Sequence, residues 1–152
     1  MTATMRAGFD AVSAATAGLG KPRTFYELDV STGPIYTVAD GSFTKEMIEL
    51  AGGDPITTGS TTDFAIPLEK LISADPQLIL LGDGVYGVTA AQVKARPGWS
   101  VMTAVKAGAI RPVNDIIVTR PGPRLVEGIR ALAVAIHPDL ALPSAAPIPP
   151  VP

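Results

Sequence analysis

The stretch that decides the fold is LILLG, residues 78–82, in the middle of the chain. Four consecutive apolar side chains without polar alternation are typical of a strand that is buried on both faces, as in a parallel sheet covered by helices. Asp75 and Pro76 break the chain just before this run, and a glycine-rich turn follows it. We therefore expect a central strand over Leu78–Gly82.

Amphipathic segments lie on both sides of this strand in the sequence. Residues 23–30, RTFYELDV, are dense in β-forming residues and predict a second strand. Helices are expected over residues 4–17, 43–51, 67–73, 89–95, 102–107 and 123–136. Short strands are expected over residues 109–113 and 115–118, and a loop over residues 54–64. This alternation predicts an α/β fold, a three-layer Rossmann-like lobe with a central, mostly parallel sheet flanked by helices.

The composition favours one soluble, globular domain. The chain has 152 residues, of which 47% are hydrophobic and 17% charged, and its formal net charge is −2. Such a charge supplies no basic field for nucleic acid or anionic lipid. Cys is absent, which excludes disulfides and thiolate chemistry. The N-terminus has no signal-peptide pattern, so a cytosolic protein or a piece of a longer one is expected.

The glycines after the central strand are the first candidates for chemistry. Gly82, Gly84 and Gly87 have the GxGxxG spacing of dinucleotide-binding loops. The acidic residue that would hold the ribose about 20 positions later is not found between Asp83 and Asp115. A plain glycine-rich loop is therefore favoured, and a nucleotide-binding enzyme fragment that uses residues 82–87 is the alternative function.

Residues suited to catalysis or metal binding are scarce. His137 is the only histidine, and its place at the end of the last expected helix favours a structural cap. One His without Cys argues against a zinc site, and no Ser lies in a GxSxG motif. We expect no enzyme activity, no cofactor and no metal site.

Other side chains are open to two interpretations each. Trp99 in PGW favours a core anchor over a ligand platform. Tyr36 and Tyr86 follow expected strands, where a phenol either meets a ligand or stays on the surface. Arg120 suits a carboxylate on a ligand or a salt bridge to a neighbouring acid. Glu69 projects from a short helix and is either a solvated carboxylate or a contact for a cationic partner.

The order of several motifs resembles the C-terminal lobe of the ABC-importer binding proteins for cobalamin, ferric siderophores or haem. Each motif is weak alone, but their order and spacing are specific and cover about residues 21–140. The motifs are PRTFYELD (22–29), GSFTKEMIELAGGD (41–54), IPLEKLISADPQLILLG (66–82), RPGWSVMTAVKAGAIRPV (96–113) and TRPGPRLVEGIRALAVAIHPDL (119–140).

The resemblance implies a domain organisation and a function. Members of this helical-backbone family bind a ligand between two α/β lobes joined by one long helix, and they dock on a membrane permease. By resemblance, residues 1–20 are the end of the interlobe helix, residues 21–140 the C-terminal lobe and residues 141–152 a Pro-rich flexible tail. The expected function is that of a ligand-binding lobe of an extracytoplasmic substrate-binding protein, here a truncated half without the N-terminal lobe.

The resemblance also implies partners and site residues. The expected partners are a corrinoid or a metal chelate (siderophore or haem) and the permease dimer in the membrane, with no nucleic acid. The expected location is periplasmic, or anchored outside the cytoplasmic membrane. Glu69 matches the position of the glutamate that meets permease arginines. The expected ligand contacts are Tyr36, Asp63, Phe64, Tyr86 and Arg120.

Overall fold

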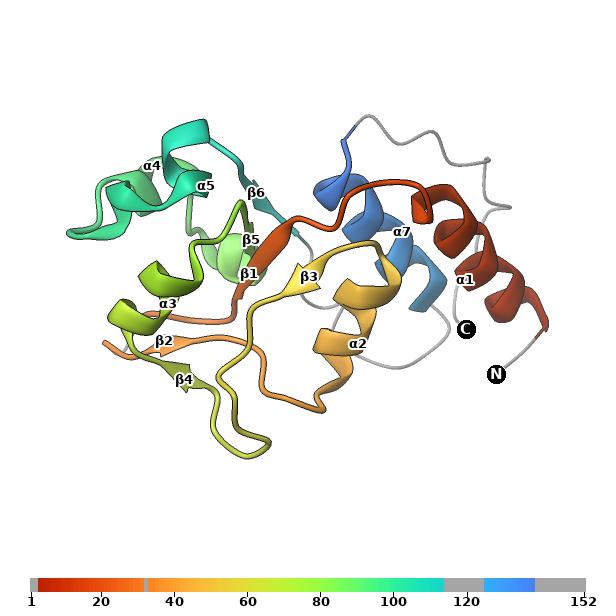
Figure 1. The fold of residues 1–152 in the computed structure, drawn as a ribbon, viewed down its shortest axis with the longest axis horizontal. Helices are drawn as coiled ribbons and strands as arrows, with labels where there is room; N and C mark the ends of the chain where they lie inside the picture. Colours follow the sequence, from red (N-terminus) through yellow and green to blue (C-terminus); the bar gives the residue numbers. More distant parts are fainter. Residues whose placement is uncertain (1–2, 32, 114–124, 139–152) are drawn as a thin grey trace.

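A four-stranded sheet lies between two layers of helices (Figure 1). The computed structural model describes residues 3–31, 33–113 and 125–138. The strand order is β3-β1-β5-β6, and every neighbouring pair is parallel. The α/β class and the parallel sheet expected from the sequence are therefore confirmed. The strands are β1 (Arg23–Glu27), β3 (Asp54–Pro55), β5 (Leu78–Leu81) and β6 (Ile110–Pro112).

The central strand β5 is buried on both faces, as the LILL run predicts. Leu78 and Leu80 belong to the hydrophobic core on one face of the sheet. Ile79 and Leu81 belong to the core on the other face. Because full burial of a Leu or Ile side chain is worth about 1.5–3 kcal/mol, this one strand stabilises both layers.

Within the described part of the chain, three helices lie on each face of the sheet, and Figure 1 shows the two layers. On one face are α1 (Ala3–Thr16), α2 (Phe43–Leu50) and α7 (Leu125–Ile136). On the other are α3 (Leu68–Ala74), α4 (Ala90–Lys94) and α5 (Thr103–Ala107). These helices agree with the expected ones to within one or two residues at each described end. On α7, Ile129, Leu132 and Ile136 lie on one face of the helix and are buried.

Specific side chains set the ends of these helices. The Ser42 hydroxyl accepts a hydrogen bond from the Lys45 amide at 3.2 Å and caps α2. Pro67 lies just before α3 and not within its first turn. At the other end of α3, the Asp75 carboxylate accepts hydrogen bonds from the Thr103 amide at 2.8 Å and from the Thr103 hydroxyl at 2.7 Å. This contact joins the end of α3 to the start of α5.

Three short strands, β2, β3 and β4, were not expected from the sequence. β3 lies within the segment that was expected to be a loop, residues 54–64. β2 (Ile35–Tyr36) and β4 (Ala65–Ile66) pair antiparallel in a separate ribbon. Each of these strands has two residues, which are too few to show the alternation of side chains that marks a strand in a sequence. Only the pairing of each strand with another one defines it. The strand expected over 23–30 ends at Glu27. The strand expected over 115–118, the start of the helix expected over 123–136 and the tail 141–152 lie outside the described residues.

Gly82, directly after β5, lies close against strand β1. A Cβ atom at Gly82 would lie 2.6 Å from the Tyr26 Cε1 atom and 2.9 Å from the Glu27 carbonyl oxygen. Because the second of these atoms is backbone, the strand itself would have to move. Gly82 therefore has a packing role.

Substitution of Gly82 tests this close approach. We expect Gly82→Ala to lower the free energy of unfolding by about 1–3 kcal/mol, because an overpacked core forces backbone shifts. Urea denaturation followed by circular dichroism measures the change. Gly18→Ala is the matched control, since a Cβ there meets no atom within 4 Å. Equal losses in the two variants would contradict the packing role of Gly82.

Candidate functional site

The carboxyl ends of the parallel strands bring together residues that are far apart in the sequence. β1 ends at Glu27, and β5 ends at Leu81 beside it in register. The chain then continues from β5 into a 3-10 turn, η1 (Gly82–Tyr86). In open parallel sheets, ligands gather beyond this edge. The candidate site therefore lies around Glu27 and the segments that follow each strand.

A buried ion pair is the main feature of this edge. Glu27 is fully buried, and both of its carboxylate oxygens accept hydrogen bonds from Arg96, Oε1 from Nη1 and Oε2 from Nη2 at 3.1 Å. The Arg96 guanidinium also lies over the Trp99 ring, 4.7 Å from its centroid. Trp99 in turn meets Phe25 edge to face, with the ring centroids 5.9 Å apart. Arg96 is thus fixed by one bidentate contact and one aromatic face.

A second carboxyl group lies beside this pair. Asp83 is only 2% exposed, and neither of its carboxyl oxygens accepts a hydrogen bond from a described group. Burial first, and then the negative charge of the nearby Glu27 carboxylate, raise the pKa of Asp83 to about 8. Arg96 opposes this rise only weakly. Near pH 7, Asp83 therefore holds its proton, and the group of Glu27, Asp83 and Arg96 is neutral overall.

A pocket of about 500 Å³ opens beside Arg96. Its walls come from the loop after β1, the β2–β4 ribbon, the start of α3 and the segment that holds Arg96 and Trp99. Most of the lining side chains are apolar, among them Val30, Ile35 and Leu68. The pocket is thus apolar, with one guanidinium in its wall.

The residues expected to contact a ligand lie on neighbouring segments. Tyr36 is half-buried in β2, where it pairs with Ala65 of β4. Phe64 is 43% exposed, and its carbonyl accepts a hydrogen bond from the Thr37 amide at 2.8 Å. Asp63 is exposed, and its Oδ1 accepts a hydrogen bond from the Ala65 amide at 3.0 Å. The ribbon thus brings three of the five expected contacts together.

The other two expected ligand-binding residues are Tyr86 and Arg120, and no described contact joins Tyr86 to the ribbon. Tyr86 is 75% exposed at the end of η1, which follows β5 at the same edge of the sheet. Arg120 lies outside the described residues. Tyr86 is therefore accessible to a ligand.

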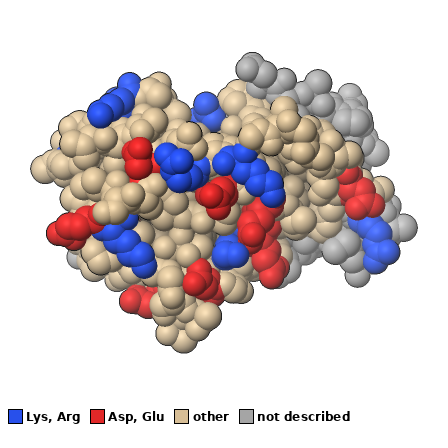
Figure 2. Space-filling view, in the orientation of Figure 1, with Lys and Arg blue, Asp and Glu red and all other residues tan. Residues whose placement is uncertain are grey.

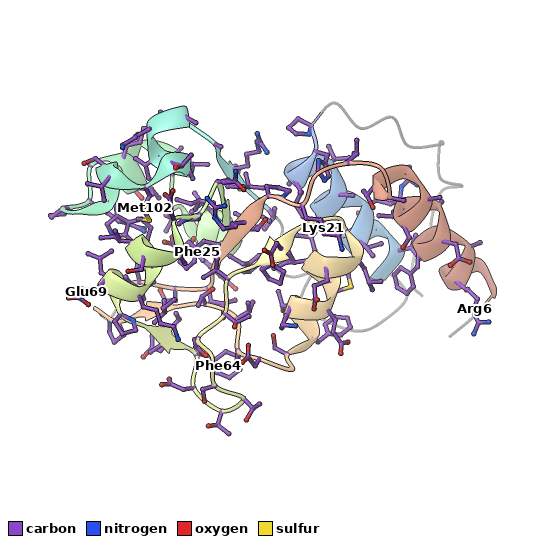
Figure 3. The ribbon with its side chains drawn as sticks, viewed as in Figure 1. Arg6, Lys21, Phe25, Phe64, Glu69 and Met102 are labelled. Carbon is purple, nitrogen blue, oxygen red and sulfur yellow. The ribbon has the colours of Figure 1, made fainter. Side chains whose placement is uncertain are left out.

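Glu69 lies in the first turn of α3 and is exposed. Figure 3 shows its side chain pointing outward at one end of the molecule, away from the ribbon segment that carries Phe64. Within the described part of the chain, its carboxylate forms no hydrogen bond or ion pair. The carboxylate is therefore accessible to an external cation.

The glycine-rich segment does not form a phosphate loop followed directly by a helix. Gly82 is required by Tyr26 and β1, and a Cβ atom at Gly84 would lie 2.8 Å from the Pro112 Cβ atom. Gly87 ends η1 with φ +101°, which favours glycine. Packing and turn geometry thus account for all three glycines, and the nucleotide-binding alternative is not favoured.

Sequence reasoning missed the central residues of this edge. Glu27 and Arg96 belong to two different motifs, and nothing in the sequence pairs two residues that are 69 positions apart. The glycine spacing around Asp83 favours a loop and gives no sign that its carboxyl group is buried. Trp99 was expected to be a core anchor, and its 3% exposure confirms this. A charged residue at the end of a strand that is otherwise buried was the available signal for Glu27.

An α/β lobe that gathers a pocket at the carboxyl edge of its sheet is typical of ligand-binding proteins. The chain belongs to the periplasmic binding protein family, whose model matches residues 2–115. An uncharacterized ABC transporter substrate-binding lipoprotein of Bacillus subtilis (strain 168), YvrC, is 35% identical over 113 residues. A cobalamin-binding protein of Halobacterium salinarum is 30% identical over 123 residues. The family resemblance expected from the motif order is confirmed.

The fold is shared with solved structures. A possible iron-binding, periplasmic solute-binding protein from Staphylococcus epidermidis matches with a TM-score of 0.77 at 24% identity, over 88% of this chain and 52% of that one. The curated matches cover 74% of this chain and 35% of the Bacillus protein, and 77% of this chain and 32% of the Halobacterium protein. The chain thus spans about a third of the length of these curated relatives.

The surface carries mixed charges. Figure 2 shows acidic and basic side chains interspersed over one face of the described residues. None of the described helices combines the length and the apolar character needed to cross a bilayer.

The buried carboxyl group makes a testable contribution to the pH dependence of stability. In the folded chain the pKa of Asp83 is about 8, whereas an unfolded Asp has its ordinary pKa of 3.8. Between these values the folded state binds one proton more than the unfolded state, so stability falls as pH rises. We expect Asp83→Asn to remove this contribution. The stability of the variant relative to the wild type should therefore rise by roughly 1 kcal/mol per unit between pH 5 and pH 8.

Urea denaturation at several pH values between 5 and 9 measures this difference. Asp54→Asn, an exposed carboxyl group in β3, controls for the loss of one negative charge and should keep the wild-type slope. Parallel pH profiles for the wild type and Asp83→Asn would show that Asp83 is ionised in the folded chain.

Proposed function

We propose that this chain is the C-terminal lobe of the substrate-binding protein of an ABC importer, and that it forms one wall of a ligand cleft. Its membership of the periplasmic binding protein family supports this, as does a match to about half of a solved member of that fold. By this proposal α1 is the end of the helix that joins the lobe to a second one. The role is binding and delivery, without catalysis.

The proposed ligand is a corrinoid or an iron chelate, either a siderophore or haem. The observation that carries the proposal is the match to a cobalamin-binding protein at 30% identity over 77% of this chain. The iron-binding description of the Staphylococcus protein supports the iron-chelate option by likeness of fold. A corrinoid is therefore the first ligand to test.

The proposed ligand-contacting residues follow the expectation from the family resemblance. Tyr36 lies in β2, Phe64 lies directly before β4, and Tyr86 is exposed at the carboxyl edge of the sheet. Aromatic side chains at such an edge suit the flat, largely apolar ring of a corrinoid or haem. Asp63 and Arg120 would supply polar contacts to the periphery of the ligand.

Glu69 is the proposed contact with the permease. Its carboxylate is exposed and has no ion-pair partner among the described residues, so an arginine of the permease can reach it. The protein would work outside the cytoplasmic membrane, free in a periplasm or anchored as a lipoprotein. The lipoprotein description of the Bacillus relative supports the anchored form.

A lobe that forms one wall of a cleft is expected to bind its ligand weakly by itself. Half of the contacts would be lost, while the cost of immobilising the ligand would remain. Calorimetric titration of the 152-residue chain with cyanocobalamin should give a dissociation constant weaker than about 1 µM. The same titration of a two-lobed receptor that contains this lobe is the control. Tighter binding by the chain alone would contradict the one-wall arrangement.

Charge reversal tests the docking role. In the full-length receptor, Glu69→Lys is expected to weaken docking on the permease by about tenfold or more and to abolish transport, because like charges then meet at the interface. The affinity for the ligand should be unchanged. Binding to permease in lipid nanodiscs and uptake into proteoliposomes measure the two effects. Glu46→Lys makes the same change in the first turn of α2 and is the matched control. Unchanged docking of Glu69→Lys would exclude the role.

A further inference from the structure

The pocket beside Arg96 lies next to Glu69 in the chain and in space. Pro67 and Leu68 line the pocket, and Glu69 follows them directly in the first turn of α3. Figure 3 shows Glu69 at one end of the molecule. A partner that reaches its carboxylate there therefore comes close to the pocket residues Pro67 and Leu68.

The β2–β4 ribbon separates this pocket from Tyr36, one of the proposed ligand contacts. Ile35 and Ile66 are paired in register, and both line the pocket. Successive side chains of a strand point to opposite faces, so Tyr36 and its pair Ala65 face away from it. The pocket therefore belongs to the side of the lobe that carries Glu69, and not to the side that carries Tyr36.

The interior of the pocket is charge-balanced. Among the described residues that line it, Arg96 alone is charged, and its guanidinium is held by both oxygens of the buried Glu27. The 18% exposure of the Arg96 side chain leaves little of it for a partner. Small-molecule sites orient their ligands with a few free polar groups. The side chains of this pocket provide almost none, so an apolar side chain suits it better than a polar solute.

We propose that this pocket is a second part of the docking surface, and that it receives an apolar side chain from an extracytoplasmic loop of the permease. This inference rests on the proposed docking role of Glu69. The partner segment would carry a cation for Glu69 beside an apolar residue for the pocket. An exposed charge next to a desolvated apolar anchor is the arrangement in which a few residues dominate the affinity of an interface.

Substitutions at Val30, which lines the pocket from the loop after β1, test the proposal. Val30→Gln is made in the full-length receptor, and docking on its cognate permease in lipid nanodiscs is measured without ligand. We expect docking to weaken about tenfold, because a polar group enters a desolvated anchor pocket. The effect should not depend on salt, since no charge changes, whereas the effect of Glu69→Lys should diminish as salt rises.

Leu50→Gln is the matched control, because Leu50 is an exposed apolar residue on α2, on the other side of the sheet. Affinity for cyanocobalamin, or for haemin where cyanocobalamin does not bind, is measured for every variant. Thermal melting checks the fold of each. If Val30→Gln lowers the melting temperature strongly, Pro34→Gln replaces it, since Pro34 is exposed and lines the same pocket.

The outcomes separate the two proposals. Weaker docking of the Val30 or Pro34 variant with unchanged ligand affinity supports the pocket as a docking element. If only Glu69→Lys weakens docking, the docking role stands and the pocket proposal is wrong. If neither substitution weakens docking, both proposals fail. If the Val30 variant loses affinity for cyanocobalamin or haemin while docking is intact, the pocket is a ligand subsite and the inference is overturned.

Discussion

Burial of β5 on both of its faces is the constraint on which the rest of the structure depends. Leu78 and Leu80 are buried on one face of the sheet, and Ile79 and Leu81 are buried on the other. Because both faces must be shielded from water, helices pack on both sides of the sheet. Parallel pairing with β1 and β6 then sets the carboxyl ends of the strands at one edge. The candidate site is therefore a consequence of the sheet, because no local sequence motif contains it.

The carboxyl edge contains an ionic cluster that a stability argument alone would not favour. Removing a carboxylate from water costs several kcal/mol, and a buried ion pair often only balances that cost. Arg96 satisfies both oxygens of Glu27, and the Trp99 ring covers the guanidinium. Asp83 avoids a second buried negative charge by keeping its proton up to about pH 8. The result is a fixed, neutral group that holds the Arg96 to Trp99 segment against the end of β1 and keeps the neighbouring pocket apolar.

The sequence allowed the fold to be predicted much further than the site. Periodicity and glycine or proline breaks located the described helices and the strands β1, β5 and β6, because these elements bury several side chains each. β2, β3 and β4 were missed since two-residue strands leave no period. Glu27 and Arg96 were missed as a pair, because the sheet brings together residues 69 positions apart. The exposure of Glu69 was predicted and is confirmed, since it depends only on the apolar face of a single short helix.

The register of the β2–β4 ribbon links the fold to both proposed surfaces. Each strand gives one side chain to the pocket, Ile35 or Ile66, and one to the opposite face, Tyr36 or Ala65. A shift of one residue would exchange the two sets, and would put a phenol in the apolar pocket and an isoleucine among the ligand contacts. Backbone hydrogen bonds from Leu28 to Tyr36 and from Tyr36 to Asp29, each 2.9 Å long, tie β2 to the segment after β1. Since β1 is itself held by β5, the buried central strand sets which side of this lobe would meet a ligand and which would meet a permease.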